Sequence, residues 1–147
     1  MGLTVEEFTP GQVWTTRART VGEGDISLFA GLSGDFNPLH VDEAFCAGTP
    51  YGTRIAHGPL GLSMAIGLMS QHNLIDGTAI GLLNVNWDFT GPVKIGDTIH
   101  ARITCAEARA SRKPGRGVVT LRLEVINQSG RTVQDGRMTL LMKTREA

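Results

Sequence analysis

The chain has 147 residues, with 14 lysines and arginines against 14 aspartates and glutamates, and 41% of its residues are hydrophobic. This length and composition predict one domain over residues 1–147 with a real core, and the balanced charge argues against a nucleic-acid or anionic-membrane binder. The longest apolar stretch, residues 59–69, is shorter than the roughly 20 residues of a membrane helix, so we expect no membrane span. The N-terminus lacks the basic and apolar start of a secretory signal, which predicts a cytoplasmic protein.

In the first third of the chain the pattern predicts a strand, a helix and a long loop. Residues 12–21 are rich in β-branched and aromatic types, which is typical of an edge strand. Thr20 and Glu23 have capping-box spacing, and apolar residues then recur at helical intervals. Residues 34–52 lose this periodicity and collect loop-forming types, with one helical turn expected over residues 42–46. So long a loop in a small domain favours a functional role.

The rest of the chain predicts one buried helix followed by strands. Residues 57–72 have a proline near the start, where its missing N–H does no harm, and are apolar or small on every face, so this helix must be surrounded. Segments of strand composition, separated by turn-like sequences, predict consecutive hairpins over residues 79–89, 98–108, 117–127 and 131–143. The expected fold class is α+β, with a long antiparallel sheet curled round one central helix.

The two cysteines give no sign of a metal site. Cys46 and Cys105 lie far apart, without a CxxC motif or a nearby pair of histidines. This spacing argues against both a zinc site and a disulfide-stapled scaffold. We therefore expect no metal, and we interpret both thiols as small apolar residues of the core.

The long loop contains an acid and an imidazole at a spacing that can bring them together. Asp35 and His40 are five residues apart with Asn37 and Pro38 between them, so the loop can fold back and aim both side chains at one small volume. On spacing alone, a turn-forming aspartate and a structural histidine explain these two residues better than catalysis does.

The start of the buried helix is a second candidate site. A helix N-terminus offers free N–H groups with partial positive charge, so the Gly58 amide could stabilise negative charge on a thioester oxygen. Close packing of the helix against the sheet explains Gly58 equally well. Ser63 places a hydroxyl one turn further on, and a bond to a backbone carbonyl one turn back explains it about as well as a role in a site.

Three segments together resemble a known family. They are GDFNPLHVD at residues 34–42, the preceding FAGLS, and RIAHGPLGLS at residues 54–63. They resemble the hydratase signature of the MaoC-like dehydratases, which include the R-specific enoyl-CoA hydratases, and VNWDFTGPVKIGDTI at residues 85–99 extends the likeness. The resemblance implies a hot-dog fold, in which a long sheet wraps one central helix.

The resemblance also implies a reaction and a set of roles. Asp35 and His40 would hold and activate the water that adds to a trans-2-enoyl thioester, giving the (R)-3-hydroxyacyl product. The Gly58 amide would bind the developing oxyanion, Asn37 would orient the pair or the water, and Ser63 would line the site and support the acidic loop. We expect no metal or bound redox cofactor, coenzyme A only as part of the substrate, and a homodimer, because a single curled sheet leaves an edge that a second copy can extend. The resemblance implies that the acyl tunnel lies between the subunits.

Other interpretations remain open at this point. The turn at residues 111–117 places Arg112, Lys113 and Arg116 together, where they could bind the phosphates of coenzyme A or an acyl carrier protein, although a solvated hairpin tip explains them more simply. A hot-dog thioesterase would use a carboxylate to cleave the C–S bond instead. A non-catalytic acyl-CoA-binding module would not need both members of the acid–base pair.

Overall fold

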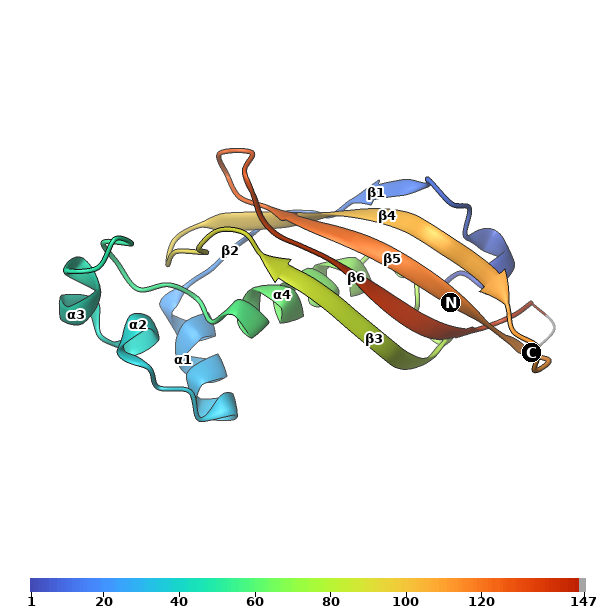
Figure 1. The fold of residues 1–147 in the computed structure, drawn as a ribbon, viewed down its shortest axis with the longest axis horizontal. Helices are drawn as coiled ribbons and strands as arrows, with labels where there is room; N and C mark the ends of the chain where they lie inside the picture. Colours follow the sequence, from blue (N-terminus) through green and yellow to red (C-terminus); the bar gives the residue numbers. More distant parts are fainter. Residues whose placement is uncertain (146–147) are drawn as a thin grey trace.

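The computed structural model describes residues 1–145. Among these residues the chain forms one long sheet, a helix packed beneath it and a group of shorter helices at one end (Figure 1). In chain order the elements are η1 (Val5–Glu7, a 3₁₀ helix), β1 (Val13–Thr15), β2 (Arg19–Thr20), α1 (Glu23–Ser33), α2 (Pro38–Val41), α3 (Glu43–Ala47), α4 (Gly58–Ser70), β3 (Ala79–Phe89), β4 (Thr98–Ala110), β5 (Arg116–Ile126) and β6 (Thr132–Lys143). No helix in this part of the chain is long and apolar enough to span a membrane.

The antiparallel sheet covers α4 and forms the core with it. Its strand order is β1-β4-β5-β6-β3, and β2 also pairs with β4. Alternate residues of β5 are buried, as the alternating sequence predicts for a strand with one face on the core. The inward residues of β5 and α4 that make up the centre of the core are Val119, Leu121, Leu123, Val125, Leu60, Met64, Ala65 and Met69. The expected α+β hot-dog arrangement is confirmed.

The expectation of consecutive hairpins is wrong for the first pair of strands. β4 pairs with β5 and β5 pairs with β6, but β3 pairs with β6 rather than with the strand that follows it. Residues 90–97 therefore cross one end of the sheet. Turn-forming residues mark where a strand ends, whereas the choice of partner depends on contacts distant in sequence, and sequential strands are neighbours only about two-thirds of the time. As a result, β3 forms an edge of the sheet.

The N-terminal elements also differ from the expectation. The strand expected over residues 12–21 is two short strands, β1 and β2, both paired with β4. Thr20 does not cap the next helix, because it lies in β2 with its hydroxyl 2.8 Å from that of Thr98. The helix begins later, with Gly22 at the N-cap and the Asp25 carboxylate accepting the Gly22 N–H at 2.8 Å. Pairing with β4 continues through Thr20, so the helix starts only at Glu23 and Thr20 lies two residues before the N-cap.

The expectation that α4 is surrounded on every face is wrong along one stripe. Pro59, Ser63 and Gly67 are exposed, at intervals of four residues, while the opposite face of the helix is buried. Residues four apart lie on one face of a helix, so the exposed positions form a continuous line. This line faces the side of the molecule on which α1 lies, since one pocket touches both helices.

The short helices form a group at one end of the sheet, which we call the helical lobe (α1, α2 and α3; Figure 1). Arg54 ties the lobe together through Glu23 of α1, at 2.6 Å, and Glu43 of α3, at 2.5 Å. Hydrogen bonds from Thr53 and then Arg54 lower the pKa of Glu43, which favours its ionised, paired form. Asp42 caps α3 by accepting the N–H of Phe45. These contacts hold residues 34–42, which include α2, beside the start of α4.

Candidate active site

The acidic residue of the site lies just past the end of α1. Gly34 closes that helix in the left-handed conformation, with φ at 77°, which glycine adopts without strain. The next residue, Asp35, is held by two local hydrogen bonds: its N–H donates to the Ser33 hydroxyl, and its carboxylate accepts the N–H of Asn37 at 3.2 Å. The Asp35 side chain is 53% exposed. The carboxylate is therefore open to solvent and oriented mainly by its own backbone.

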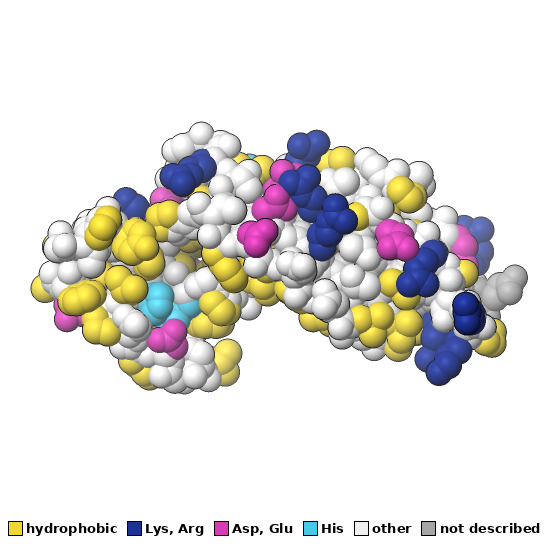
Figure 2. All heavy atoms as spheres, viewed as in Figure 1, with side chains coloured by type: hydrophobic (Ala, Val, Ile, Leu, Met, Phe, Trp, Pro, Cys, Tyr) yellow, Lys and Arg dark blue, Asp and Glu magenta, His cyan; other side chains and the backbone are white. Residues whose placement is uncertain are grey.

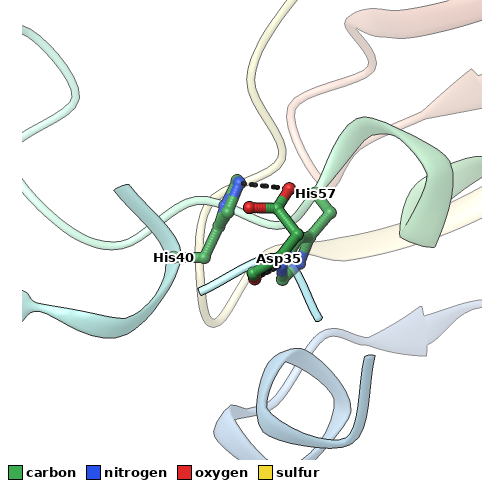
Figure 3. Close-up of side chains that lie close together, drawn as sticks. All are labelled: Asp35, His40 and His57. Atoms are coloured by element: carbon green, nitrogen blue, oxygen red, sulfur yellow. Dashed lines mark hydrogen bonds and ion pairs between the residues drawn. The ribbon is translucent and has the colours of Figure 1, made fainter. Parts of the chain in front are cut away.

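The imidazole of the pair comes from α2. His40 Nδ1 lies 2.7 Å from the carbonyl oxygen of Ile55. A carbonyl oxygen only accepts, so Nδ1 carries a proton, and in the neutral ring Nε2 presents a lone pair. This Nε2 lies 3.8 Å from Asp35 Oδ2, as Figure 3 shows. The gap is too long for a direct hydrogen bond, but one water molecule about 2.8 Å from each atom could donate to both.

A second histidine completes the group and was missed by the sequence reasoning. His57 precedes α4, is 2% exposed, and donates from Nε2 to the Asp35 carbonyl oxygen at 2.9 Å. Its ring stacks on that of His40, with centroids 3.7 Å apart and planes 24° from parallel. Gly58 was singled out from the sequence at the start of a helix. The position of His57 directly before it was the one feature of the sequence that could have drawn attention to this histidine. Its contacts with the loop depend on the folded chain.

The Gly58 amide lies at the N-terminus of α4, as expected. It belongs to the first residue of the helix, so no carbonyl within the helix can accept its N–H. A Cβ at this position would lie 2.9 Å from the Phe89 ring, so glycine lets that ring approach the start of α4 closely. The backbone carbonyl of Gly58 accepts a hydrogen bond at 3.3 Å from the buried side chain of Gln134. Both packing and an oxyanion role are therefore compatible with glycine here.

Two pockets border α4, and Asp35, His40 and His57 line neither of them. One, of about 290 Å³, opens between α1 and α4 and is mainly apolar; its lining includes Leu28, Phe29, Leu32, Leu60, Ser63 and Met64. The other, of about 300 Å³, lies between the start of α4 and the end of β3, with Gly58, Phe89 and Gln134 in its wall. At the end of the molecule that holds the helical lobe, histidine side chains are visible at the surface beside an acidic side chain and among hydrophobic ones (Figure 2).

The remaining candidate residues fall into two groups. Asn37 and Ser63 are close to the site, but each side chain bonds locally: Asn37 Oδ1 caps α2 through the Leu39 N–H, and the Ser63 hydroxyl donates to the Pro59 carbonyl at 2.7 Å. Ser63 thus lines the first pocket, and its hydroxyl is bonded within α4 rather than to the acidic loop. The basic turn that contains Arg112, Lys113 and Arg116 lies at the far end of the sheet from the helical lobe (Figure 1).

The three clustered side chains are also the candidate metal ligands. Asp35, His40 and His57 each offer one atom, and these atoms lie within 4.8 Å of one another. The lone pairs of an imidazole lie in the plane of its ring, and two stacked rings do not direct them at one ion. His57 Nε2 is also engaged by the Asp35 carbonyl. The arrangement fits an acid–base site better than a metal centre, and the absence of a metal stays a prediction.

Known proteins resemble this chain over nearly its whole length. The model of the MaoC like domain matches residues 6–127. An (R)-specific enoyl-CoA hydratase of Rhodospirillum rubrum is 34% identical over 140 residues, covering 95% of this chain and 92% of the relative.

Solved structures agree with this similarity. A structure described as a monoamine oxidase regulatory protein from Archaeoglobus has a TM-score of 0.89 and 36% identity, covering 97% of this chain and 95% of that one. The (R)-hydratase from Aeromonas caviae has a TM-score of 0.79 and 31% identity, covering 92% and 97%. With the match of the domain model to most of the residues, these similarities show that the chain belongs to the MaoC-like dehydratase family.

Proposed function

We propose that this protein is a hydro-lyase that catalyses the reversible hydration of a trans-2-enoyl thioester, most simply an enoyl-CoA, to the (R)-3-hydroxyacyl thioester. The observation that carries the proposal is the pair formed by the Asp35 carboxylate and the His40 Nε2 lone pair, 3.8 Å apart at the start of α4. The family and the named hydratase relative support the same reaction.

The geometry allows a balanced proton transfer. The pair holds one water molecule and takes a proton from it as the water oxygen bonds to C3 of the enoyl group. Electron density moves onto the thioester oxygen, where the Gly58 amide and the positive end of α4 stabilise it. The pair then delivers one proton to C2 on the same face. The site returns to its starting protonation state, so the reverse dehydration uses the same groups.

The apolar pocket between α1 and α4 is a suitable place for the acyl chain. Leu28 and Leu32 of α1 are 76% and 86% exposed, and they face Leu60 and Met64 of α4 across this pocket. Burying an acyl chain there would remove apolar surface from water on both sides. Coenzyme A is part of the substrate in this proposal, with an acyl carrier protein as the alternative carrier. No separate cofactor is required.

The natural partner in this proposal is a second copy of the chain. The edge strand β3 exposes hydrophobic side chains along its length, namely Ile80, Leu82, Leu83, Val85 and Phe89. An unpaired apolar edge is unfavourable in water, and a two-fold dimer would extend the sheet and cover it. An acyl tunnel between subunits would follow from such a dimer. A cytoplasmic location stays a prediction.

The dimer can be tested by placing a charge on the edge strand. Leu83→Lys should shift the protein from dimer to monomer in analytical ultracentrifugation, because a buried lysine at the interface would lack a partner. Val13→Lys is the matched control, since Val13 is also an exposed apolar residue but lies on β1, at the opposite edge. A wild-type protein that sediments as a monomer at micromolar concentration would refute the dimer.

The reaction is tested by following the loss of enoyl absorbance with crotonyl-CoA and longer enoyl-CoA esters up to twelve carbons. His40→Ala should lower the hydration rate by about a few hundredfold, whereas His72→Ala, a change of the same kind at an exposed histidine outside the site, should leave it unchanged. Release of free thiol would instead identify a thioesterase. Binding of both enoyl and hydroxyacyl esters without interconversion would identify a non-catalytic module. Comparison of crotonyl-CoA with a crotonyl carrier protein would separate the two substrate carriers.

A further inference from the structure

We infer that His57 is a positioning residue for the hydration, in that one buried side chain fixes both the Asp35 backbone and the His40 ring. The inference rests on the proposed function, since positioning matters only if Asp35 and His40 act on substrate. His57 touches both members of the pair, which come from the loop and from α2 (Figure 3). Among the described side chains no other has both of these contacts.

The first contact fixes the position of Asp35. The carboxylate is largely exposed, and its recorded hydrogen bond comes from the Asn37 N–H next to it in the loop. The position of the carboxylate therefore depends on where the backbone of the loop lies. His57 Nε2 donates to the carbonyl of that same residue at 2.9 Å and links it to the start of the buried helix.

The second contact fixes the plane of His40. The His57 ring lies between two others: His40 stacks on it at 3.7 Å, and Phe29 of α1 contacts it at 4.9 Å with a 54° tilt. The Ile55 carbonyl holds His40 Nδ1 from another direction. Together these contacts restrict rotation of the His40 ring and keep Nε2 directed at the Asp35 carboxylate.

Two observations argue that His57 is more than a packing or capping residue. It occupies the N-cap position of α4, yet its side chain makes no capping hydrogen bond, because the ring is turned toward the loop. Its Nδ1 is buried and has no hydrogen-bond partner among the described residues. A buried polar atom without a partner is unfavourable and calls for an explanation, and an orienting role beside Asp35 and His40 supplies one. A purely structural position would be served better by an apolar ring.

Two substitutions separate the two contacts. His57→Gln keeps an N–H that can reach the Asp35 carbonyl but removes the stacked ring, whereas His57→Phe keeps a stacked ring but removes the donor. Since misplacing a catalytic group by about 1 Å can cost about a hundredfold in rate, we expect kcat to fall about a hundredfold in His57→Phe and about tenfold in His57→Gln. KM should stay within about twofold in both variants, because neither contact in this proposal is made to the substrate.

The control for a merely structural role is a double substitution. If His57 acts through the acid–base pair, adding His57→Phe to Asp35→Asn should cost little beyond Asp35→Asn alone. An equal loss in both backgrounds, or a loss that follows only the melting temperature, would overturn the inference. So would a His57→Phe enzyme with wild-type kcat.

A readout without substrate keeps this test independent of the proposed reaction. In hydrogen–deuterium exchange, His57→Phe should speed exchange of the amides of residues 35–42 at least several-fold while the amides of β5 keep their protection. Wild-type protein without hydration activity would refute the proposed function and with it the catalytic part of the inference, whereas the exchange result would still decide whether His57 holds the loop in place. Unchanged exchange in the loop would overturn it.

Discussion

The two halves of the site are built in opposite ways. The loop half, residues 33–42, carries the reactive groups on exposed backbone held by short polar contacts, and its acid is 53% exposed. The helix half, residues 57–70, is buried against the sheet and contributes an amide, a buried ring and apolar side chains. The groups proposed to react therefore lie in the sparsely packed loop half, whereas the helix half, which is packed against the sheet, contributes groups that orient them. Changes of the reactive groups in the loop half should therefore lower the rate with little effect on stability, whereas truncation of buried apolar side chains in the helix half should lower stability. His57 is the exception in the helix half, because it contacts both members of the acid–base pair.

The largest effect is expected from Asp35→Asn. Loss of the charged acid–base group should lower kcat about a thousandfold, in the range typical of such groups. Because the side chain is half exposed and not part of the core, the melting temperature should change by no more than about 2 °C. Steady-state kinetics and calorimetry on the same preparation measure both quantities.

A matched control for this change is available in the same loop. Asp42 is exposed and caps α3 through Phe45, and asparagine caps a helix nearly as well. Asp42→Asn should therefore leave both kcat and melting temperature close to wild type. A large loss of activity in Asp42→Asn would mean that general charge in the loop, rather than Asp35 itself, supports the reaction.

The opposite outcome is expected in the helix half. Met69 of α4 is fully buried in the core and lines neither pocket. Met69→Ala should lower the free energy of unfolding by about 2–5 kcal/mol through the cavity it leaves, while kcat of the folded protein stays within about threefold. Urea unfolding gives the first value. If kcat instead fell as in Asp35→Asn at a temperature where the variant is folded, the division between the halves would not hold.

Gln134 gives an intermediate case, since it connects the sheet to the helix half. Its buried side chain accepts from Trp87 Nε1 at 3.0 Å and donates to the Gly58 carbonyl at 3.3 Å. A Cβ on Gly61 would collide with this amide, so the helix approaches it closely. Gln134→Leu would leave the indole N–H unpaired, and we expect a loss of about 1–3 kcal/mol in the free energy of unfolding.

A second variant tests the hydrogen bond between Trp87 and Gln134 by changing its donor. Trp87→Phe removes the indole donor, leaving Gln134 Oε1 without this partner. If the hydrogen bond between these two side chains contributes to stability, the double variant Trp87→Phe/Gln134→Leu should lose clearly less free energy of unfolding than the sum of the two single variants. Strict additivity in urea unfolding would show that packing, rather than the hydrogen bond, is responsible.

How far the sequence could predict this molecule depends on the range of the contacts. Local patterns were sufficient to locate α4 and the four long strands, from the apolar residues of α4 and from β-branched composition bounded by turn-forming residues, although burial alternates clearly in β5 and not in β3. Pairing of β3 with β6 and the displacement of Thr20 from its expected cap follow from contacts distant in sequence, which no local pattern records.

The site divides in the same way. The Asp35–His40 juxtaposition follows from a tight loop and its spacing, so the motif could predict it. The Ser63 hydroxyl bonds to the carbonyl one turn back, which is one of the two interpretations that the sequence allowed. The contacts of His57 depend on where neighbouring elements pack, and they could not be predicted from the sequence. A motif identifies reactive groups, whereas the residues that hold them become visible only in the folded protein.

The smallest effect is expected outside both halves, at the basic turn between β4 and β5. Arg112 and Lys113 are exposed at the end of the sheet away from the helical lobe, so within one chain they are remote from the reacting groups (Figure 1). The double variant Arg112→Ala/Lys113→Ala should keep KM for an enoyl-CoA within about twofold, as expected for solvated charges. A tenfold rise in KM that vanishes at high salt would instead show that this turn binds the phosphates of coenzyme A. In a dimer, that contact would have to reach the site of the second copy, because the distance along one sheet is too great.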